Sequence, residues 1–414
     1  MTKGFWPGLI AMVLVASGVG AESAVPLPTR FRLSHITADK WRADYVFATP
    51  VSSLDLGPGV GEYRKKAWRV LTPGIELTER PDREVISAGG RAFTRLSIEV
   101  SLYLPWSEGN YTAFDRMSDG GTDIFLGFFA GDASVGDSVR PLHLKVKLSG
   151  LAHETVIAPD DHDTDRLSYA YFGPATPRQA GVANLIVDPN SPGWMTELLQ
   201  ETTAAITGYY DHAFQRPLPY KPLIMVSISD FAQPGLSMKG GAVGKQVVYR
   251  IGGKALVSGS PQVRSLFKEL IAHELAHVWQ NNVARGGIGG EEPWVHEGGA
   301  EAIALAGLRG SGLYSQAEAD AYSAKLTREC DALNDSVETY RGYYACGFAR
   351  FASYKTDVFA LWKAMMEATE SSGATYSSAM IEAILRRNAL PAGKIKPDDD
   401  GQRRIALPAG SLSR

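Results

Sequence analysis

The sequence predicts an α+β protein in which an N-terminal antiparallel β domain precedes a mostly helical domain. Residues 95–104 and 142–148 alternate polar and apolar side chains with period two, as strands with one buried face do. From about residue 260 onward, apolar residues recur every three or four positions, which is typical of amphipathic helices. With 414 residues the chain is too long for one ordinary core, so we expect two domains.

The first 21 residues have the pattern of a secretory signal peptide. Lys3 supplies a positive charge, and residues 8–19 form an apolar run that is too short to span a membrane. Small residues at 19–21 permit cleavage after Ala21; an uncleaved interfacial anchor is the alternative. No later segment is apolar enough for a membrane span. We therefore expect an exported protein, periplasmic or extracellular, without a membrane span in the mature chain.

Residues 22–184 are expected to form the β-rich N-terminal domain. Predicted strands follow one another there without intervening helices, which favours an antiparallel sandwich or saddle. Clusters of glycine and aspartate, such as residues 118–121, end these runs.

Residues 185–390 are expected to form the second domain, and residues 391–414 a loosely ordered C-terminal tail. Strands are predicted at residues 185–187, 223–228 and 246–251. Helices are predicted at residues 194–214, 261–284, 294–309, 315–331, 340–353, 356–370 and 374–388.

Composition is that of a globular protein, with 44% hydrophobic and 21% charged residues. The net charge of −3 and the lack of a basic stripe give nucleic-acid binding no electrostatic support. Cys330 and Cys346 are the two cysteines, and in an oxidising compartment we expect them to form a disulfide. Two buried free thiols are the alternative. His35, His143, His153 and His212 lack metal-ligand spacing and are expected to be structural or exposed.

The run His273-Glu274-Leu275-Ala276-His277 predicts a metal centre on a helix. Its two imidazoles are four residues apart and therefore project from one helix face, where both can reach one Zn²⁺. Glu274 is rotated by about 100° around the helix and is placed to reach the metal-bound water as a general base.

A second predicted helix supplies further carboxylates. Glu297 completes a set of two histidines and one glutamate, which leaves a fourth zinc position for water. Glu301 lies four residues further on the same helix face. We expect it to hydrogen-bond the ring of His273 or His277, although it could itself be a ligand.

Together, residues 273–279 (HELAHVW) with Asn282, and residues 294–298 (WVHEG), resemble the gluzincin superfamily, most closely the aminopeptidase N type of catalytic domain. The resemblance covers roughly residues 185–390 and implies a thermolysin-like fold. It implies zinc ligation by His273, His277 and Glu297, with Glu274 as the base.

The resemblance also implies a tyrosine that stabilises the tetrahedral oxyanion from a Tyr-x-x-Gly step. Residues 344–347 (YACG) match this step and make Tyr344 the candidate. A phenol is a suitable donor because it is neutral at pH 7. Tyr340 and Tyr343 are neighbours that could take the role instead.

Some features depart from the aminopeptidase pattern. Such enzymes bind the substrate amine with a glutamate in a Gly-x-Met-Glu-Asn strand, and the corresponding residues 241–245 (GAVGK) carry no acid. Glu291 and Glu292 are possible substitutes. His296 stands where the family has asparagine, and the sequence assigns it no role. The strand at 246–251 could bind an extended peptide by edge pairing.

The sequence thus predicts an exported zinc metallopeptidase with a peptide or protein substrate. Whether it acts as an endopeptidase or an aminopeptidase stays open at this point, as does its oligomeric state. A hydrolase of the same fold with a non-peptide substrate, and a zinc-retaining binding module without turnover, are the alternatives.

Overall fold

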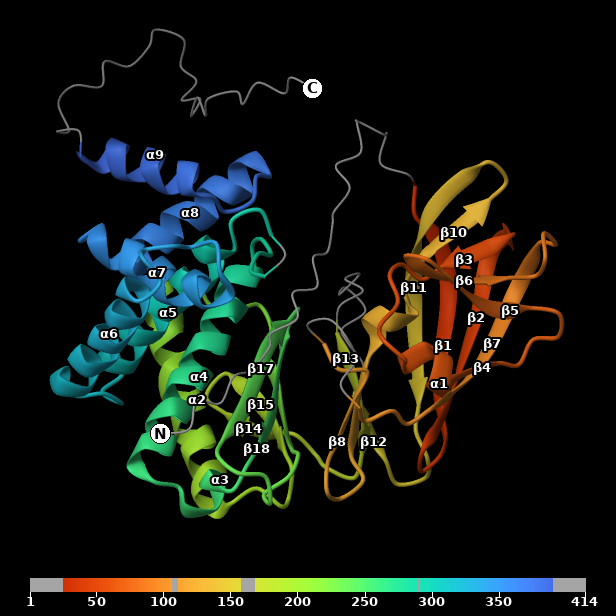
Figure 1. Ribbon diagram of the computed structural model, residues 1–414, viewed down its shortest axis with the longest axis horizontal. Coiled ribbons are helices and arrows are strands. Elements are labelled where there is room, and N and C mark those ends of the chain that lie inside the picture. The colour runs from red at the N-terminus through yellow and green to blue at the C-terminus, as the bar shows by residue number, and fades with distance from the viewer. Residues whose placement is uncertain (1–24, 106–110, 158–167, 289, 390–414) are drawn as a thin grey trace, which may run out of the picture. The chain divides into compact units, whose positions relative to one another are not determined.

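The computed structural model describes residues 25–105, 111–157, 168–288 and 290–389 (Figure 1). The chain divides into two compact units, Met1–Gly208 with Pro219–Val278, and Tyr209–Leu218 with Trp279–Arg414. The predicted signal peptide and the predicted tail lie outside the described residues. Among the described helices, none is long and apolar enough to cross a membrane. The domain boundary predicted at residues 184 and 185 stays a prediction.

The largest sheet of the first unit has nine strands. Its order is β4 (Trp68–Val70), β7 (Phe93–Ser101), β2 (Lys40–Val51), β1 (Leu27–Thr37), β11 (Ser138–Ser149), β10 (Asp132–Val135), β3 (Ser53–Asp55), β6 (Arg83–Ser87) and β5 (Glu76–Arg80). Neighbouring strands are antiparallel except for β1 and β11, which run parallel from the pair Leu27–Leu142 to the pair Ser34–Ser149. The expected purely antiparallel arrangement is therefore wrong at this pair, because about a hundred residues separate the two strands and can connect them in either direction.

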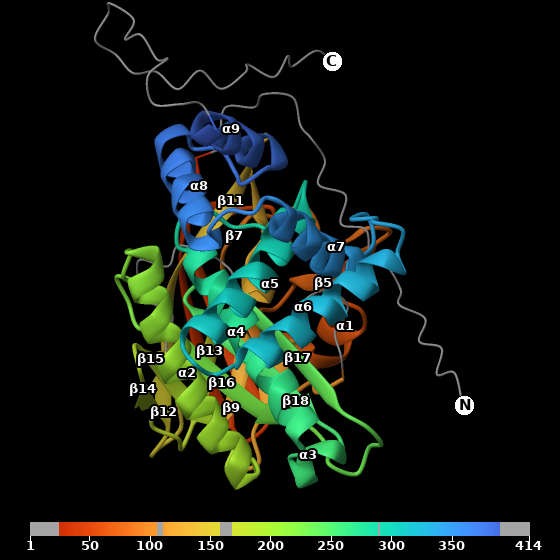
Figure 2. The same ribbon diagram turned by 90° about the vertical axis from the view of Figure 1, so that its left-hand side faces the viewer.

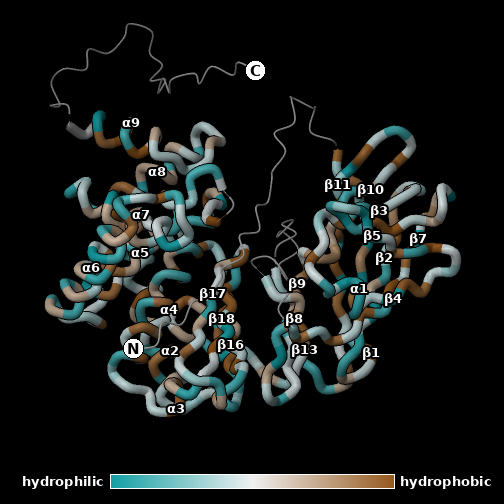
Figure 3. The backbone as a smooth tube through the Cα atoms, viewed as in Figure 1, coloured by the Kyte–Doolittle hydropathy of each residue, from teal (hydrophilic) through white to brown (hydrophobic). Residues whose placement is uncertain are grey.

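Burial along these strands follows the alternation seen in the sequence. In β1 the buried residues are every second one from Leu27 to His35, and the residues between them face outward. Figure 3 shows the same interleaving of hydrophobic and hydrophilic segments along the strands. The inward faces bury large aromatic side chains, including Phe31, Trp41 and Tyr45.

A second sheet of the same unit has four strands. Its order is β12 (Thr155–Ile157), β13 (Tyr169–Gly173), β9 (Thr122–Phe125) and β8 (Phe114–Arg116). Phe114 and Phe172 of this sheet belong to the same hydrophobic core as the nine-stranded sheet. The short helix η1 (Leu126–Phe129) connects β9 of this sheet to β10 of the nine-stranded sheet, and α1 (Tyr63–Ala67) connects β3 to β4 within the nine-stranded sheet.

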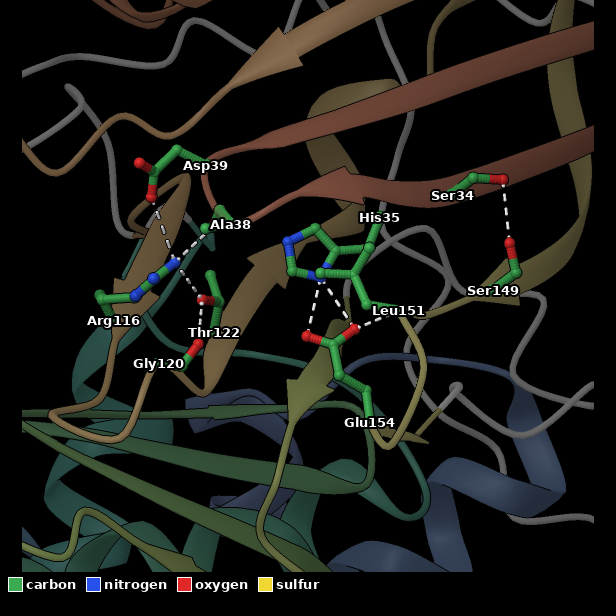
Figure 4. A network of polar contacts seen from close by, with 10 residues as sticks. All are labelled: Ser34, His35, Ala38, Asp39, Arg116, Gly120, Thr122, Ser149, Leu151 and Glu154. Carbon is green, nitrogen blue, oxygen red and sulfur yellow. Dashed lines mark hydrogen bonds and ion pairs between the residues drawn. The ribbon is translucent and has the colours of Figure 1, made fainter.

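Polar contacts fasten the loops of these two sheets (Figure 4). The Nδ1 atom of His35 lies 2.8 Å from both carboxylate oxygens of Glu154, and its ring stacks on Trp41 at 4.3 Å. Arg116 donates to the carbonyl of Ala38 at 2.9 Å and to Oγ1 of Thr122 at 3.1 Å. His35 is therefore structural, as its isolation from other metal-ligating residues in the sequence predicts.

A five-stranded sheet follows in the chain. Its order is β14 (Arg178–Ala180), β15 (Ala183–Val187), β16 (Leu223–Ile228), β18 (Gln246–Gly252) and β17 (Ser237–Val243). β17 and β18 form an antiparallel hairpin, and β17 is an edge strand. The prediction that residues 246–251 could pair with a peptide as a sheet edge is therefore wrong, because β16 and β17 flank β18 on both sides.

Helices make up most of the remaining chain, as predicted (Figure 2). They are α2 (Gly193–Phe214), α3 (Ala255–Ser258), α4 (Pro261–Asn281), α5 (Pro293–Gly310), α6 (Gln316–Asp331), α7 (Tyr340–Ser353), α8 (Val358–Ser372) and α9 (Ser378–Ala389). In the second unit, Tyr210, Phe214, Trp279 and Phe359 form one aromatic cluster with ring centroids 4.9–6.2 Å apart. The disulfide between Cys330 and Cys346 is present and joins α6 to α7.

Candidate metal centre

Helix α4 carries the first part of the site because its apolar stripe is buried. Phe267, Ile271 and Leu275 recur at four-residue intervals and are fully buried. The ring of Phe267 meets Tyr249 of β18 edge to face, with centroids 6.5 Å apart. Pro261 occupies the first position of the helix, where its missing N–H costs no hydrogen bond.

The two histidines of α4 face one another one turn apart. Their Nε2 atoms are 3.0 Å apart, and their rings are nearly perpendicular at 87°. His273 and His277 are each 6% exposed. A four-residue helical spacing thus produces the paired imidazole nitrogens that the sequence predicts.

Helix α5 supplies the third group. It begins at Pro293, follows the polar residues Glu291 and Glu292, and buries Glu297 to 5% exposure. One ligand atom of each of His273, His277 and Glu297 lies within 4.8 Å of the others. Among the described residues, this is the one such group of at least three histidine, cysteine or acidic side chains.

These donors fit zinc. Two imidazole nitrogens and one carboxylate oxygen are a common catalytic zinc set. Bonds of about 2.0–2.1 Å in a tetrahedron place two nitrogens roughly 3.3 Å apart, close to the 3.0 Å between the two Nε2 atoms. His273, His277 and Glu297 are therefore able to hold Zn²⁺ together.

Glu274 lies against the edge strand β17. A Cβ atom on Gly240 would stand 2.9 Å from Oε1 of Glu274 and 3.0 Å from its Cγ, so only glycine fits without displacing the carboxylate. Glu274 is 7% exposed. The role of Gly240 was not predicted from the sequence, although two adjacent glycines, Gly240 and Gly241, are an unusual feature in a strand and could have indicated it.

Helix α7 carries the predicted oxyanion donor. The hydroxyl of Thr339 accepts from the backbone N–H of Gly342 at 3.0 Å and fixes the start of the helix. Tyr344 follows in the second turn, half-buried, with its ring 5.3 Å from that of Tyr340. Tyr340 is 59% exposed, which makes it the less enclosed of the two phenols.

Glu301 accepts a hydrogen bond from the hydroxyl of Tyr322 in α6. Tyr322 is buried and Glu301 is half-buried. This bond anchors the carboxylate one turn beyond Glu297. The predicted support of a histidine ring by Glu301 stays a proposal.

His296 is buried among aromatic rings in the second unit. Its ring stacks beside Tyr376 at 6.3 Å and meets the edge of Trp362 at 6.4 Å. Its backbone carbonyl accepts from Nε2 of Gln280 at 3.1 Å, and the carbonyl of Gln280 accepts from the hydroxyl of Tyr376 at 2.8 Å. Packing at the start of α5 is thus the observed role of His296.

Strand β17, which overlaps the residues expected to bind a substrate amine, carries no acidic residue. Residues 241–243 end the strand, and Gly244 with Lys245 form the two-residue turn of the hairpin. Glu292 accepts from the backbone N–H of Ser378 at 2.9 Å, at the start of α9, and so has a structural partner. Glu291 is exposed.

No family model and no curated protein sequence matches the chain. Among solved structures, an aminopeptidase N family protein from Idiomarina loihiensis is similar with a TM-score of 0.61 and 12% identity, over 88% of this chain and 73% of that one. An M1 zinc metallopeptidase from Deinococcus radiodurans has a TM-score of 0.46 and 13% identity, over 88% of this chain and 90% of that one. Yeast LTA4 hydrolase has a TM-score of 0.48 and 11% identity, over 89% of this chain and 65% of that one. The first of these shows that the chain has a fold like that of the aminopeptidase N family protein.

Proposed function

We propose that this protein is an exported zinc-dependent peptidase whose metal is held by His273, His277 and Glu297. The observation that carries the proposal is the gathering of these three buried side chains from α4 and α5, with Glu274 on α4 beside the edge strand β17. Buried charges and imidazoles are costly unless paired or bound to a metal, so their concentration here needs a functional reason.

When bound, Zn²⁺ supplies Lewis acidity that polarises a carbonyl and lowers the pKa of a water molecule. The carboxylate of Glu274 is then the proton acceptor for the attacking water, and it returns the proton to the leaving amine. The phenol of Tyr344 donates a hydrogen bond to the oxygen that becomes negatively charged in the tetrahedral intermediate. Glu301, which accepts a hydrogen bond from Tyr322, would orient the ring of His273 or His277.

The edge strand β17 supports a peptide as the substrate. An extended peptide can pair with the unpaired side of an edge strand, which holds its backbone in one register. Gly240 and Gly241 lack side chains and so leave the backbone of β17 open to close approach beside Glu274. A peptide in that position would present its backbone carbonyls to the base.

The absence of an acidic residue from β17 supports cleavage inside a chain over removal of N-terminal residues. An aminopeptidase needs a carboxylate to hold the substrate ammonium, and residues 237–243 (SMKGGAV) carry a lysine and no acid. We therefore propose endopeptidase activity.

The test is to incubate a mixed peptide library with zinc-loaded wild type and with Glu274→Gln, and to map the products by mass spectrometry. We expect internal cuts that only the wild type makes, with equal zinc in both proteins. Glu201→Gln, which changes an exposed carboxylate on α2, is the matched control and should cut like the wild type.

Two outcomes would overturn parts of the proposal. Stepwise loss of N-terminal residues would show an aminopeptidase with its amine-binding carboxylate elsewhere. The lack of any cut by the zinc-loaded wild type would reject the peptidase and favour a non-peptide hydrolase or a binding module, which a screen of esters and epoxides would separate.

A further inference from the structure

The outward face of the nine-stranded sheet carries four cations where β1 and β11 lie side by side. Arg30 and Lys145 are Cα partners in the parallel register of the two strands, and so are Arg32 and Lys147. All four side chains are exposed, and each alternates with more buried residues along its strand. We call these four residues the cationic patch.

The outward side chains of the two strands meet on this face. At the outward pair that follows Arg32 and Lys147, the hydroxyl of Ser149 donates to the hydroxyl of Ser34 at 3.0 Å (Figure 4). Neighbouring strands are about 4.8 Å apart, and alternate residues of one strand are roughly 6.6 Å apart. The four charges of the cationic patch therefore lie close together. Neither strand is a basic run by itself, so the patch arises only because the two strands pair in parallel.

Within the described part of the chain, no acidic side chain forms an ion pair with the cationic patch. Asp44 of β2 is the Cα partner of Arg32, but its Oδ1 atom pairs with Nε of Arg42 at 3.0 Å. Like charges that face one another across neighbouring strands destabilise a sheet. The net charge of the whole chain is −3, so the positive charge of this face is local. An anionic partner would relieve the repulsion within the patch.

Exposed apolar side chains flank the cationic patch at both ends. Ile36 is 50% exposed and continues the outward series of β1, and Val139 is 58% exposed and begins the outward series of β11. Membrane-surface binding combines two such features, because apolar side chains enter the headgroup region while cations attract anionic lipids. Of the eight exposed large apolar side chains among the described residues, four lie in β1 or β11 or within two residues of them: Val25, Ile36, Val139 and Leu151.

We propose that the cationic patch binds a membrane surface that contains anionic phospholipids, and that it holds the protein at that surface. The phosphate groups of these lipids supply the negative charges, and the apolar side chains at the two ends of the patch contact the boundary between headgroups and acyl chains. A soluble polyanion would pair with the cations but would leave Ile36 and Val139 in water. The inference does not depend on the proposed peptidase function, because none of these residues belongs to the metal centre.

The test is sedimentation of the full chain with vesicles of neutral phosphatidylcholine and with vesicles in which about 30% of the lipid is phosphatidylglycerol. We expect the wild type to bind the anionic vesicles roughly 10²- to 10³-fold more tightly, because each cation near such a surface contributes about fivefold. The ratio of the two affinities cancels any attachment by other segments that does not depend on lipid charge. Raising the salt concentration to about 0.5 M should remove most of the difference.

Two pairs of substitutions test the cationic patch from its two strands. Arg30→Gln with Arg32→Gln should lower the affinity ratio about 10- to 30-fold, and Lys145→Gln with Lys147→Gln should lower it by a similar factor. Equal affinity of the wild type for the two kinds of vesicle, or a ratio that survives both pairs of substitutions, would overturn the inference.

The control is Lys65→Gln with Lys66→Gln, which removes two exposed lysines of α1 in the same unit. Their charges are already balanced, since Lys65 lies 3.6 Å from Glu79 and Lys66 lies 3.7 Å from Glu62. This variant should change the affinity ratio by about twofold at most. A loss as large as that of the patch variants would show that total charge, and not the cationic patch, determines binding, and would overturn the inference.

A further variant separates a membrane surface from a soluble polyanion as the partner. Ile36→Ser with Val139→Ser should weaken binding to the anionic vesicles about three- to tenfold, and should leave binding of the soluble polyanion heparin unchanged. Vesicle binding that is unaffected by this variant, together with heparin binding that the patch substitutions remove, would identify a soluble polyanion as the partner and overturn the membrane assignment.

Discussion

The backbone of Gly347 stands where a side chain of Gly298 would be. A Cβ atom on Gly298 would lie 2.3 Å from the carbonyl carbon of Gly347, and one on Gly347 would lie 2.8 Å from Cα of Gly298. Helices α5 and α7 therefore touch backbone to backbone. Because Glu297 precedes Gly298 and Tyr344 lies one turn before Gly347, this contact ties a proposed metal ligand to the proposed oxyanion donor.

Gly347→Ala should separate the two helices and disturb the site. We expect a loss of about 1–3 kcal/mol in the free energy of unfolding, as for overpacked cores, with a lower kcat. Denaturant unfolding and peptide cleavage measure the two effects. Gly208→Ala is the control: nothing lies within 4 Å of a Cβ there, within α2, so stability should stay or rise by about 0.5–1 kcal/mol. A Gly347→Ala protein equal to the wild type in both measurements would show that the close contact is dispensable.

Tyr344→Phe should lower kcat by roughly 10²- to 10³-fold with little change in KM. The phenol donates to an oxygen that is negatively charged only beyond the ground state, so its loss affects the transition state selectively. Tyr340→Phe, on an exposed ring, should leave kcat unchanged. An unaltered kcat in Tyr344→Phe would transfer the role to Tyr340 or Tyr343.

Asp123 should make stability depend on pH. It is fully buried, neither carboxylate oxygen has a hydrogen-bond partner among the described residues, and burial raises its pKa well above the ordinary 3.8, with Asp115 adding to the effect. The folded state thus holds a proton that the unfolded state releases above pH 3.8. This contribution to stability is present in full below pH 3.8 and is lost as pH rises towards the raised pKa of the folded state.

Asp123→Asn should therefore gain stability relative to the wild type as pH rises, by about 1–3 kcal/mol between pH 4 and 7.5. Urea unfolding at both pH values measures the difference. Asp137→Asn, at an exposed turn, is the control and should show no such trend. A difference between Asp123→Asn and wild type that does not change with pH would contradict a protonated buried Asp123.

The disulfide between Cys330 and Cys346 should stabilise the helical unit. Closing a loop of about sixteen residues contributes roughly 3 kcal/mol in the chain-entropy model. We expect the Cys330→Ser, Cys346→Ser double variant to unfold at lower denaturant concentration, with a larger loss of activity than of zinc, because α7 carries Tyr344. Equal denaturant midpoints for the double variant and the wild type would show that the disulfide does not stabilise the helical unit.

The helices were predictable because their signal is local. The observed α5 and α7 agree within one residue with the predictions at 294–309 and 340–353, since caps and apolar periodicity lie within each segment. The runs at 223–228 and 246–251 are likewise strands β16 and β18, because buried strands read as short apolar runs.

Pairings between distant segments were not predictable. β17 contains two adjacent glycines and alternates weakly, so its strand conformation depends on pairing with β18. The parallel pairing of β1 with β11 joins segments whose order no local pattern encodes. For the same reason, the three side chains proposed to bind zinc could be named from spacing, but the ion pair between Asp115 and Arg250 could not, because these two residues meet only in the folded chain.

We propose that His273, His277 and Glu297 hold one zinc ion, and the zinc content of the protein, measured by inductively coupled plasma mass spectrometry, tests this assignment. We expect about one zinc per chain in the wild type and in Glu274→Gln, and almost none in His273→Ala or His277→Ala after dialysis. Circular dichroism confirms that the variants stay folded. Full zinc occupancy in both folded histidine variants would contradict the assignment of the metal centre.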